Sequence, residues 1–130
     1  AGAVIVLFSD TNLVERSREI ARYGADELND EQLERFNSRF PQMFETYDEF
    51  YESNYLSINA GLITMNLVYA IKNRGYDANI ILGFNRTSKI NDLLEVEYRY
   101  RPELIIPLGT AALKGVPSYR LPQEKIIEIR

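Results

Sequence analysis

Residues 54–74 read NYLSINAGLITMNLVYAIKNR, and this stretch decides the fold that the rest of the sequence predicts. At helical pitch, one side of the stretch carries Ile58, Leu62, Met65 and Tyr69. The opposite side carries Leu56, Ala60, Ile63, Leu67 and Ala70. A helix that is apolar on two sides is enclosed between other elements rather than laid on a surface. Polar residues such as Asn59 and Asn66 interrupt the run, so it does not predict a membrane span, which needs about 20 predominantly apolar residues.

The segments on either side of this stretch extend and bound the helix. No breaker separates Gln42 from Gly75, which predicts one long helix or two in line. Gly75 can take the left-handed conformation that ends a helix. Before it, Asn29 and Gln32 have the spacing of a capping box and open a shorter helix. Pro41 is expected to stop that helix, because proline removes a helical hydrogen bond.

Four segments have strand character. Ala3–Phe8 is a continuous apolar run and predicts a central strand covered on both faces, which suggests that a further segment precedes it. Asp77–Leu82 is a short extended segment, and Glu103–Leu108 is a second apolar strand in which Pro107 costs a ladder hydrogen bond and predicts a bulge or an edge. Glu124–Ile129 alternates enough to predict a terminal strand.

Two further helices complete the predicted elements. One covers residues 12–23 and ends at Gly24, and a short one follows a cap at Thr87 or Ser88. We find no internal repeat, low-complexity tract or linker, so residues 1–130 are expected to form a single domain.

Composition excludes several classes of function. The net charge is −4 and the sequence pI is about 4.9, which argues against a nucleic-acid-binding surface. The chain contains no Cys and no His, which excludes Ser-His-Asp and Cys-His catalysis and Cys- or His-bearing zinc sites within it. Its first residues read as a strand rather than a signal peptide, and the lack of Cys fits a reducing compartment, so we expect a cytoplasmic protein. Any chemistry must use carboxylates, Lys, Tyr, Ser or a bound cofactor.

Two groups of side chains on the long helix are candidates for a site. The acidic group could ligate a metal, but its members share one face, so a solvated helix face is favoured. It consists of Glu45, Asp48, Glu49 and Glu52. The aromatic row could stack on a planar ligand, although rows at helical spacing usually belong to a core or an interface. It consists of Phe44, Tyr47, Tyr51 and Tyr55. We therefore predict no metal site here.

Two single residues have a functional interpretation beside a structural one. Gly83 follows an extended run, where it can serve a turn or allow a ligand to approach the backbone closely. Arg120 lies between two prolines in a loop, where it can be an ordinary surface residue or bind a phosphate in bidentate fashion.

Three segments, taken in order, resemble the C-terminal part of the flavin-dependent nitroreductases. They are the apolar helix, GYDANIILGFN at 75–85, and ELIIPLGTAALKGVPSYRLPQEKI at 103–126. The resemblance implies an α+β protein with a three-layer α/β/α arrangement, a central sheet and a long buried helix in an intertwined homodimer. It also implies that the chain is the C-terminal two-thirds of such a protein and that the family's N-terminal segment is absent.

The resemblance further implies a site. The family's Pro-x-x-Gly-Phe segment passes the flavin ring and matches residues 80–84, so Ile81, Leu82 and Gly83 would contact the ring of FMN through their backbone. A late Lys/Ser-x-Arg element binds the FMN phosphate and matches Ser118 and Arg120. The chain departs from the family by having isoleucine at position 80 in place of proline, and Leu82 in place of a common acidic residue.

The activity implied is hydride transfer from NAD(P)H through FMN to a nitroaromatic or quinone acceptor, by a ping-pong scheme. Flavin chemistry needs neither His nor Cys, since the cofactor carries the hydride and the protein supplies binding and orientation. The sequence offers no catalytic side chain for this reaction, and no nucleic-acid or membrane partner. The alternative is a non-catalytic α/β interaction or dimerisation module that retains the fold without the cofactor.

Overall fold

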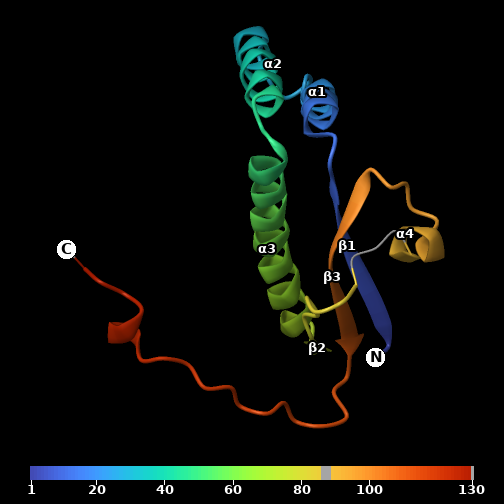
Figure 1. The fold of residues 1–130 in the computed structure, drawn as a ribbon, viewed down its shortest axis with the longest axis vertical. Helices are drawn as coiled ribbons and strands as arrows, with labels where there is room; N and C mark the ends of the chain where they lie inside the picture. The colour runs from blue at the N-terminus through green and yellow to red at the C-terminus, as the bar shows by residue number, and fades with distance from the viewer. Residues whose placement is uncertain (86–88, 130) are drawn as a thin grey trace.

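A three-stranded antiparallel sheet organises the chain in the computed structural model, which describes residues 1–85 and 89–129 (Figure 1). The strands are β1 (Ala3–Asp10), β2 (Asp77–Ala78) and β3 (Tyr100–Gly109), in the order β1-β3-β2. The prediction of a central first strand is wrong for this sheet. β3 takes the central place, because its neighbours pair on both sides and it carries the most deeply buried apolar residues of the sheet.

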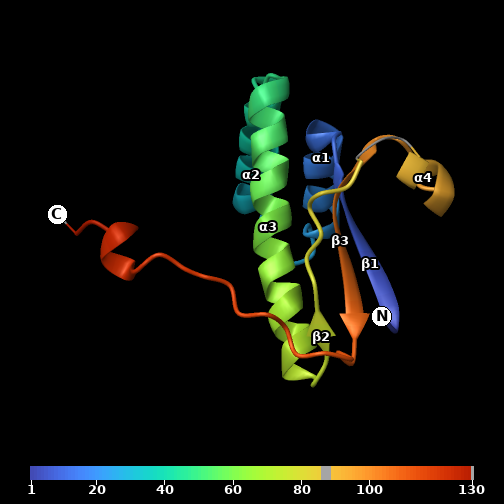
Figure 2. The same ribbon diagram turned by 60° about the horizontal axis from the view of Figure 1, so that its bottom comes forward.

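The core lies between this sheet and one long helix. Leu104 and Ile106 of β3, 3% and 0% exposed, pack with Ile71 of α3 (Glu49–Asn73). The short helix α4 (Lys89–Leu94) lies on the other side of the sheet from α3 in both views (Figures 1 and 2). The predicted α+β fold, with helices on both sides of a central sheet, is therefore confirmed. The predicted caps of α4, Thr87 and Ser88, lie outside the described residues.

A β-bulge in β3 directs a charged side chain into the interface with α3. Leu7 pairs with Leu104 and Phe8 pairs with Pro102, so Glu103 is the extra residue on β3. In a bulge, one strand contributes an extra residue and changes the direction of its side chains. Glu103 and Leu104 consequently both turn toward α3, and Glu103 is only 3% exposed.

Pro107 explains a break between β2 and the segment that follows it. Ile105 and Ile81 exchange two backbone hydrogen bonds, and the amide of Asn79 donates to the carbonyl of Pro107 at 3.1 Å. In a strand, residues two apart face the same neighbour, so the missing N–H of Pro107 also faces Asn79. Pairing is therefore regular at Asp77–Ala78 and at Ile81 but lost between them. The predicted loss of a ladder bond at Pro107 has this structural consequence. The predicted bulge or edge at Pro107 is wrong, because β3 is the central strand and its register with β1 is unbroken at Pro107.

The helices before the core differ from the prediction at one point. α1 (Leu13–Tyr23) packs against α2 (Asp30–Glu45), which begins with the predicted capping box of Asn29 and Gln32. Pro41 does not stop α2, so that prediction is wrong. The helix continues through the proline to Glu45, and the tilted rings of Phe36, Phe40 and Phe44 lie in contact along it.

The break between α2 and α3 falls at residues 46–48 instead. The Asp48 side chain accepts a hydrogen bond from the amide of Tyr51 at 2.8 Å and so starts α3. The Thr46 hydroxyl donates to the carbonyl of Met43 at the end of α2. At the other end of α3, Gly75 has a φ of +81°, as its role in ending the helix predicts.

One side of α3 is buried and the other is open within this chain. Leu56, Ala60 and Thr64 are at most 5% exposed and face the sheet side. The opposite stripe is largely exposed, with Ile58 at 65% and Leu62 at 63%. Of the two apolar sides that the sequence shows, a single chain therefore covers one in part, since Ile63 on that side is still 55% exposed, and leaves the other open.

The C-terminal segment leaves the body of the protein. Residues 110–129 run from the end of β3 past the C-terminal end of α3, to the side of that helix opposite the sheet (Figures 1 and 2). The predicted strand at Glu124–Ile129 is wrong. The amides of Ile126 and Ile127 donate to the carbonyl of Gln123 around the short 3-10 helix η1 (Gln123–Lys125), because no strand of the described chain lies beside them to pair.

Candidate functional site

The predicted ring-binding residues lie where the chain leaves the sheet. Ile81 is held beside β3 by its two hydrogen bonds with Ile105, at 2.9 and 3.1 Å. Leu82 comes next and is 58% exposed. The amide of Phe84 donates to the carbonyl of Leu82 at 3.1 Å, which folds a tight turn around Gly83. A rigid strand thus presents a short stretch of open backbone.

Neither packing nor conformation within this chain explains the glycine at position 83. A Cβ atom built there would meet no heavy atom within 4 Å, and Gly83 is not among the residues with positive φ. Within the described residues, the amides of Leu82 and Gly83 donate no hydrogen bond. These features fit a group outside the chain that comes close to the backbone and accepts hydrogen bonds from it.

The predicted phosphate-binding residues lie on the C-terminal segment. Ser118 and Arg120 are exposed. The Arg120 guanidinium donates to the carbonyl of Tyr119 at 3.1 Å, and it forms no ion pair with the carboxylates of the described residues. It is therefore a cation available to an anionic ligand, although nothing in its own chain fixes its direction toward one.

A single chain does not bring the two halves of the predicted site together. Residues 81–83 run along the sheet between β2 and α4, whereas the C-terminal segment ends on the far side of α3 (Figure 2). One mononucleotide could contact both halves only if they came from two copies of the chain. The geometry therefore makes a site shared between subunits the arrangement to test.

Two charge clusters that sequence reasoning missed fix the frame around these segments. Asp10, at the end of β1, accepts hydrogen bonds from Arg16 at 2.7 Å and from Arg99 at 2.7 and 3.1 Å. Burial alone would raise the pKa of Asp10, but the hydrogen bonds from Arg99, Arg16 and the Asn12 amide outweigh it and lower that pKa. The same contacts raise the pKa of Arg99 and Arg16.

The second cluster follows from the bulge in β3. Arg101 donates to Glu103 at 2.6 and 3.0 Å, and also to the hydroxyls of Ser53 and Ser57 on α3. These contacts tie the first half of α3 to the central strand. The sequence signal was the Arg-x-Glu pair inside a strand, but only the bulge places both side chains against the same helix.

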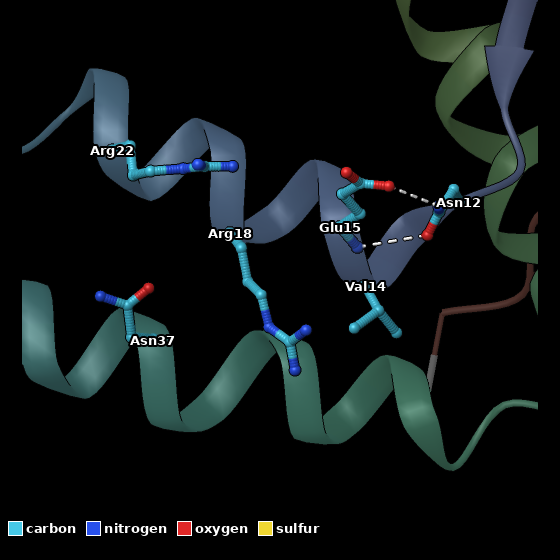
Figure 3. Close-up of a pocket in the computed structure, with 6 residues that line it drawn as sticks. All are labelled: Asn12, Val14, Glu15, Arg18, Arg22 and Asn37. Atoms are coloured by element: carbon cyan, nitrogen blue, oxygen red, sulfur yellow. Dashed lines mark hydrogen bonds between the residues drawn. The ribbon is translucent and has the colours of Figure 1, made fainter.

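A surface groove lies elsewhere, between α1 and α2 (Figure 3). It encloses about 660 Å³ and is lined by Asn12, Val14, Glu15, Arg18, Arg22 and Asn37. Three of its polar side chains bind one another or a neighbour: Asn12 bonds to Glu15, and Arg18 pairs with Glu45 at 3.2 Å. None of the predicted site residues lines it. We interpret it as a polar seam that joins two helices.

The described residues contain no group of three or more Asp or Glu side chains placed to hold a metal ion. Two members of the acidic group have other partners: Asp48 caps α3, and Glu45, at the end of α2, pairs with Arg18. No helix in the described parts of the chain is both long and apolar enough to cross a membrane.

The fold and the open backbone at residues 81–84 can now be compared with known proteins. The chain is an α+β protein with helices on both sides of an antiparallel sheet, and the model of the nitroreductase family matches residues 3–110. The chain belongs to the nitroreductase family.

Individual relatives agree with this assignment. A protein of Streptococcus pyogenes named "Putative NAD(P)H nitroreductase" is 43% identical over 127 residues, which cover 98% of this chain and 63% of the relative. The crystal structure of a nitroreductase family protein from Streptococcus pneumoniae is 50% identical, with a TM-score of 0.91 over 98% of this chain and 64% of that one. A structure from Exiguobacterium sibiricum, described as a complex with FMN, is 26% identical with a TM-score of 0.90 over 100% of this chain and 63% of that one.

These matches show how much of its relatives the chain spans and that its C-terminal segment has a counterpart in one of them. The chain spans about 63% of the length of the relatives it matches. In addition, residues 111–129 are 19 of the 130 residues, about 15% of the chain. A TM-score of 0.91 over 98% of the chain therefore requires that part of this projecting segment follow a similar course in the solved relative.

Proposed function

We propose that the protein to which this chain belongs is an FMN-dependent oxidoreductase, in which residues 1–130 form one nitroreductase-like domain. It takes hydride from NAD(P)H and passes it to a nitroaromatic or quinone acceptor in a ping-pong reaction. Membership of the family supports the oxidoreductase class, and the relative described as an FMN complex supports the cofactor. The single observation that carries the proposal is the unexplained glycine at position 83, in a turn whose backbone is open.

The residues present fit a flavin in two separate places. The open amides of Leu82 and Gly83 can donate to the polar edge of a planar ring, and Ile81 fixes them to the sheet. Arg120, which lacks a carboxylate partner among the described residues, can bind a phosphate, with the Ser118 hydroxyl beside it. When bound, FMN supplies the hydride-accepting and hydride-donating chemistry, and the chain binds and orients the cofactor.

The two places can serve one flavin if the site forms between two subunits. Support for a homodimer comes from the exposed apolar stripe of α3, which consists of Ile58, Leu62, Met65 and Tyr69, each 47–69% exposed. Contiguous apolar surface of this kind marks an interaction site. We propose that a second copy covers this stripe and that the C-terminal segment of each copy brings Arg120 to the other's ring-binding turn. A cytoplasmic location and small-molecule acceptors, without nucleic acid or membrane, complete the proposal.

Titration of the complete protein with FMN, followed by quenching of flavin fluorescence, tests the proposal. Arg120→Ala removes a charge-assisted contact worth about 1.5–3 kcal/mol, so the Kd for FMN should rise about 10- to 150-fold. Arg35→Ala is the matched control, because Arg35 is an exposed arginine on α2. A Kd that changes less than about twofold in the Arg120 variant would contradict the assigned role.

The alternative function remains a non-catalytic α/β dimerisation module. The separation of the two halves within one chain is the observation that favours it. If the complete protein binds no FMN and oxidises no NAD(P)H with a quinone acceptor, the module is the better description. If it binds FMN and turns over, the module is excluded.

A further inference from the structure

The C-terminal segment leaves the sheet through one well-defined point, its root at residues 109–111. Gly109 is the last residue of β3 and pairs with Asp77 of β2. On the β1 side, the amide of Gly2 donates to the carbonyl of Leu108 at 2.8 Å, and a Cβ on Gly109 would lie 2.7 Å from the Gly2 nitrogen. The chain is therefore confined on that side as it leaves the strand.

On the other side, the root is held by a single carboxylate. The Ala111 amide donates to Oδ2 of Asp77 at 3.2 Å, and Nζ of Lys72 donates to Oδ1 of the same residue at 2.6 Å. Lys72 belongs to the last turn of α3, so Asp77 joins three elements: the long helix, the sheet edge and the start of the segment. A surface groove of about 410 Å³ passes this point, and Asp77, Ala111 and Leu113 all line it.

Between Ala111 and Arg120, the described residues form no hydrogen bond to the body of the protein, and the bonds at residues 122–127 hold local turns. The amides of Lys125, Ile126 and Ile127 all donate to carbonyls at residues 122 and 123. The direction of the segment is therefore set mainly at its root. A solved relative shares part of that course, as its TM-score requires, so the direction is a feature of the fold.

Because the segment is long, a small change in the chain direction at residues 109–111 produces a large displacement of Arg120. Arg120 lies nine residues after Ala111, and an extended chain covers at most about 3.3–3.6 Å per residue, or about 30 Å. A change of about 10° at the root would then move Arg120 by up to about 5 Å. A binding constellation tolerates misplacement of only about 0.5 Å.

We propose that Asp77 is a positioning residue, which fixes the direction of residues 111–129 and so places Arg120 in the flavin site of the neighbouring subunit. The proposal rests on the proposed function for its second half. Its first half, the anchoring of Ala111, stands on the observed contacts alone. Asp77 itself touches neither flavin nor substrate in this scheme.

The anchor is tested by hydrogen exchange at the Ala111 amide in the complete protein. Asp77→Ala removes the acceptor, so exchange at Ala111 should accelerate by about tenfold or more, and trypsin should cleave faster after Lys114. Asp77→Asn keeps a side-chain carbonyl but loses the charge that attracts Lys72, and should give an intermediate rate. Asp92→Ala is the control, since Asp92 also accepts a side-chain hydrogen bond, from Tyr98, but lies on α4. Unchanged exchange in the Asp77→Ala variant would overturn the anchor.

The link to the flavin site is tested by a double-mutant cycle on the Kd for FMN. Asp77→Ala should weaken FMN binding about tenfold in the wild-type background. In the Arg120→Ala background it should weaken binding by less than about twofold, because Asp77 acts through Arg120. An equal loss in both backgrounds would overturn the proposal, since a general loss of folding acts regardless of Arg120.

The cycle also separates this proposal from the proposed function. If the wild-type protein binds no FMN, both the proposed function and the positioning role of Asp77 fail. Hydrogen exchange at the Ala111 amide still decides whether Asp77 anchors the segment. If FMN binds and Arg120→Ala weakens it but Asp77→Ala does not, the proposed function stands and the positioning role of Asp77 is refuted.

Discussion

Replacing Asp10 by asparagine should destabilise the protein strongly at neutral pH and hardly at all in acid. Asp10 joins the end of β1 to the start of α1 through Arg16 and to the start of β3 through Arg99. Its side chain is only 12% exposed. An asparagine side chain at this position would keep the shape but would turn amide hydrogens toward two guanidinium groups that are themselves only donors.

The expected magnitude follows from the contacts. A hydrogen bond to a charged group contributes about 1.5–3 kcal/mol, and Asp10 accepts three from arginine. Both arginines are about one-third exposed, at 33% and 30%, so water replaces part of what they lose. We therefore expect Asp10→Asn to lower the free energy of unfolding by about 2–3 kcal/mol at pH 7.

The pH dependence has a definite sign. The hydrogen bonds from Arg99 and Arg16 overcome the effect of burial and hold the pKa of Asp10 below its ordinary value. An acid with a lowered pKa in the folded state stabilises the fold above the unfolded pKa of about 3.9, and that contribution is lost as the pH falls through the folded value. The difference between wild type and Asp10→Asn should therefore shrink as the pH falls from about 4 toward about 2.

Urea unfolding followed by circular dichroism, at one protein concentration and at several pH values, measures this difference. Asp26→Asn is the control, because Asp26 is exposed on the α1–α2 connection, and it should change stability by less than about 0.5 kcal/mol. The reasoning is refuted if Asp10→Asn costs less than about 0.5 kcal/mol at pH 7, or if its cost is the same at pH 7 and at the lowest pH where the protein still folds.

Three further stability predictions concern the frame of the site, each measured by urea or thermal unfolding against wild type. Ile106→Ala should cost about 2–5 kcal/mol, because Ile106 is fully buried; a cost below about 1 kcal/mol would mean that the core rearranges to fill the cavity. Asp48→Ala should cost about 1 kcal/mol through loss of the cap on α3, whereas Asp48→Asn should cost much less. Gly75→Ala should cost about 1 kcal/mol from its φ of +81°, and a stabilising effect would contradict that conformation.

Features that depend on a few neighbouring residues were predictable from the sequence. The capping box of Asn29 and Gln32 is one, since both partners lie within one helical turn. The positive φ of Gly75 is another, because the end of a long helix calls for it. The lost ladder bond at Pro107 was also foreseeable, because proline always lacks the donor.

Features that depend on a distant partner were not predictable. The bulge at Glu103 arises from the register between β1 and β3, which lie far apart in the sequence. Pro41 is expected to end a helix, but α2 continues through it, with phenylalanine rings in contact on both sides of the proline. The pattern at 124–129 suits a strand, yet a strand forms only where another lies beside it.

The candidate site was reachable only in part by physical reasoning. Gly83 and Arg120 stood out as single residues, each with a structural role as an alternative. The resemblance to a family joined them into one site, and the structure then showed that a lone chain keeps them apart. What brings them together would be the arrangement of two chains, which the pattern of one sequence does not encode directly.

The exposed apolar stripe of α3 has a consequence for how the protein folds and assembles. A newly made chain that has folded alone would still present Ile58, Leu62 and Tyr69 to water. Whatever binds that stripe stabilises the folded form by mass action. If a second copy is what binds the stripe, the melting temperature should rise with protein concentration. Refolding after dilution out of denaturant should be slow and prone to aggregation. In the proposed homodimer, association with a second copy would be the last step of folding.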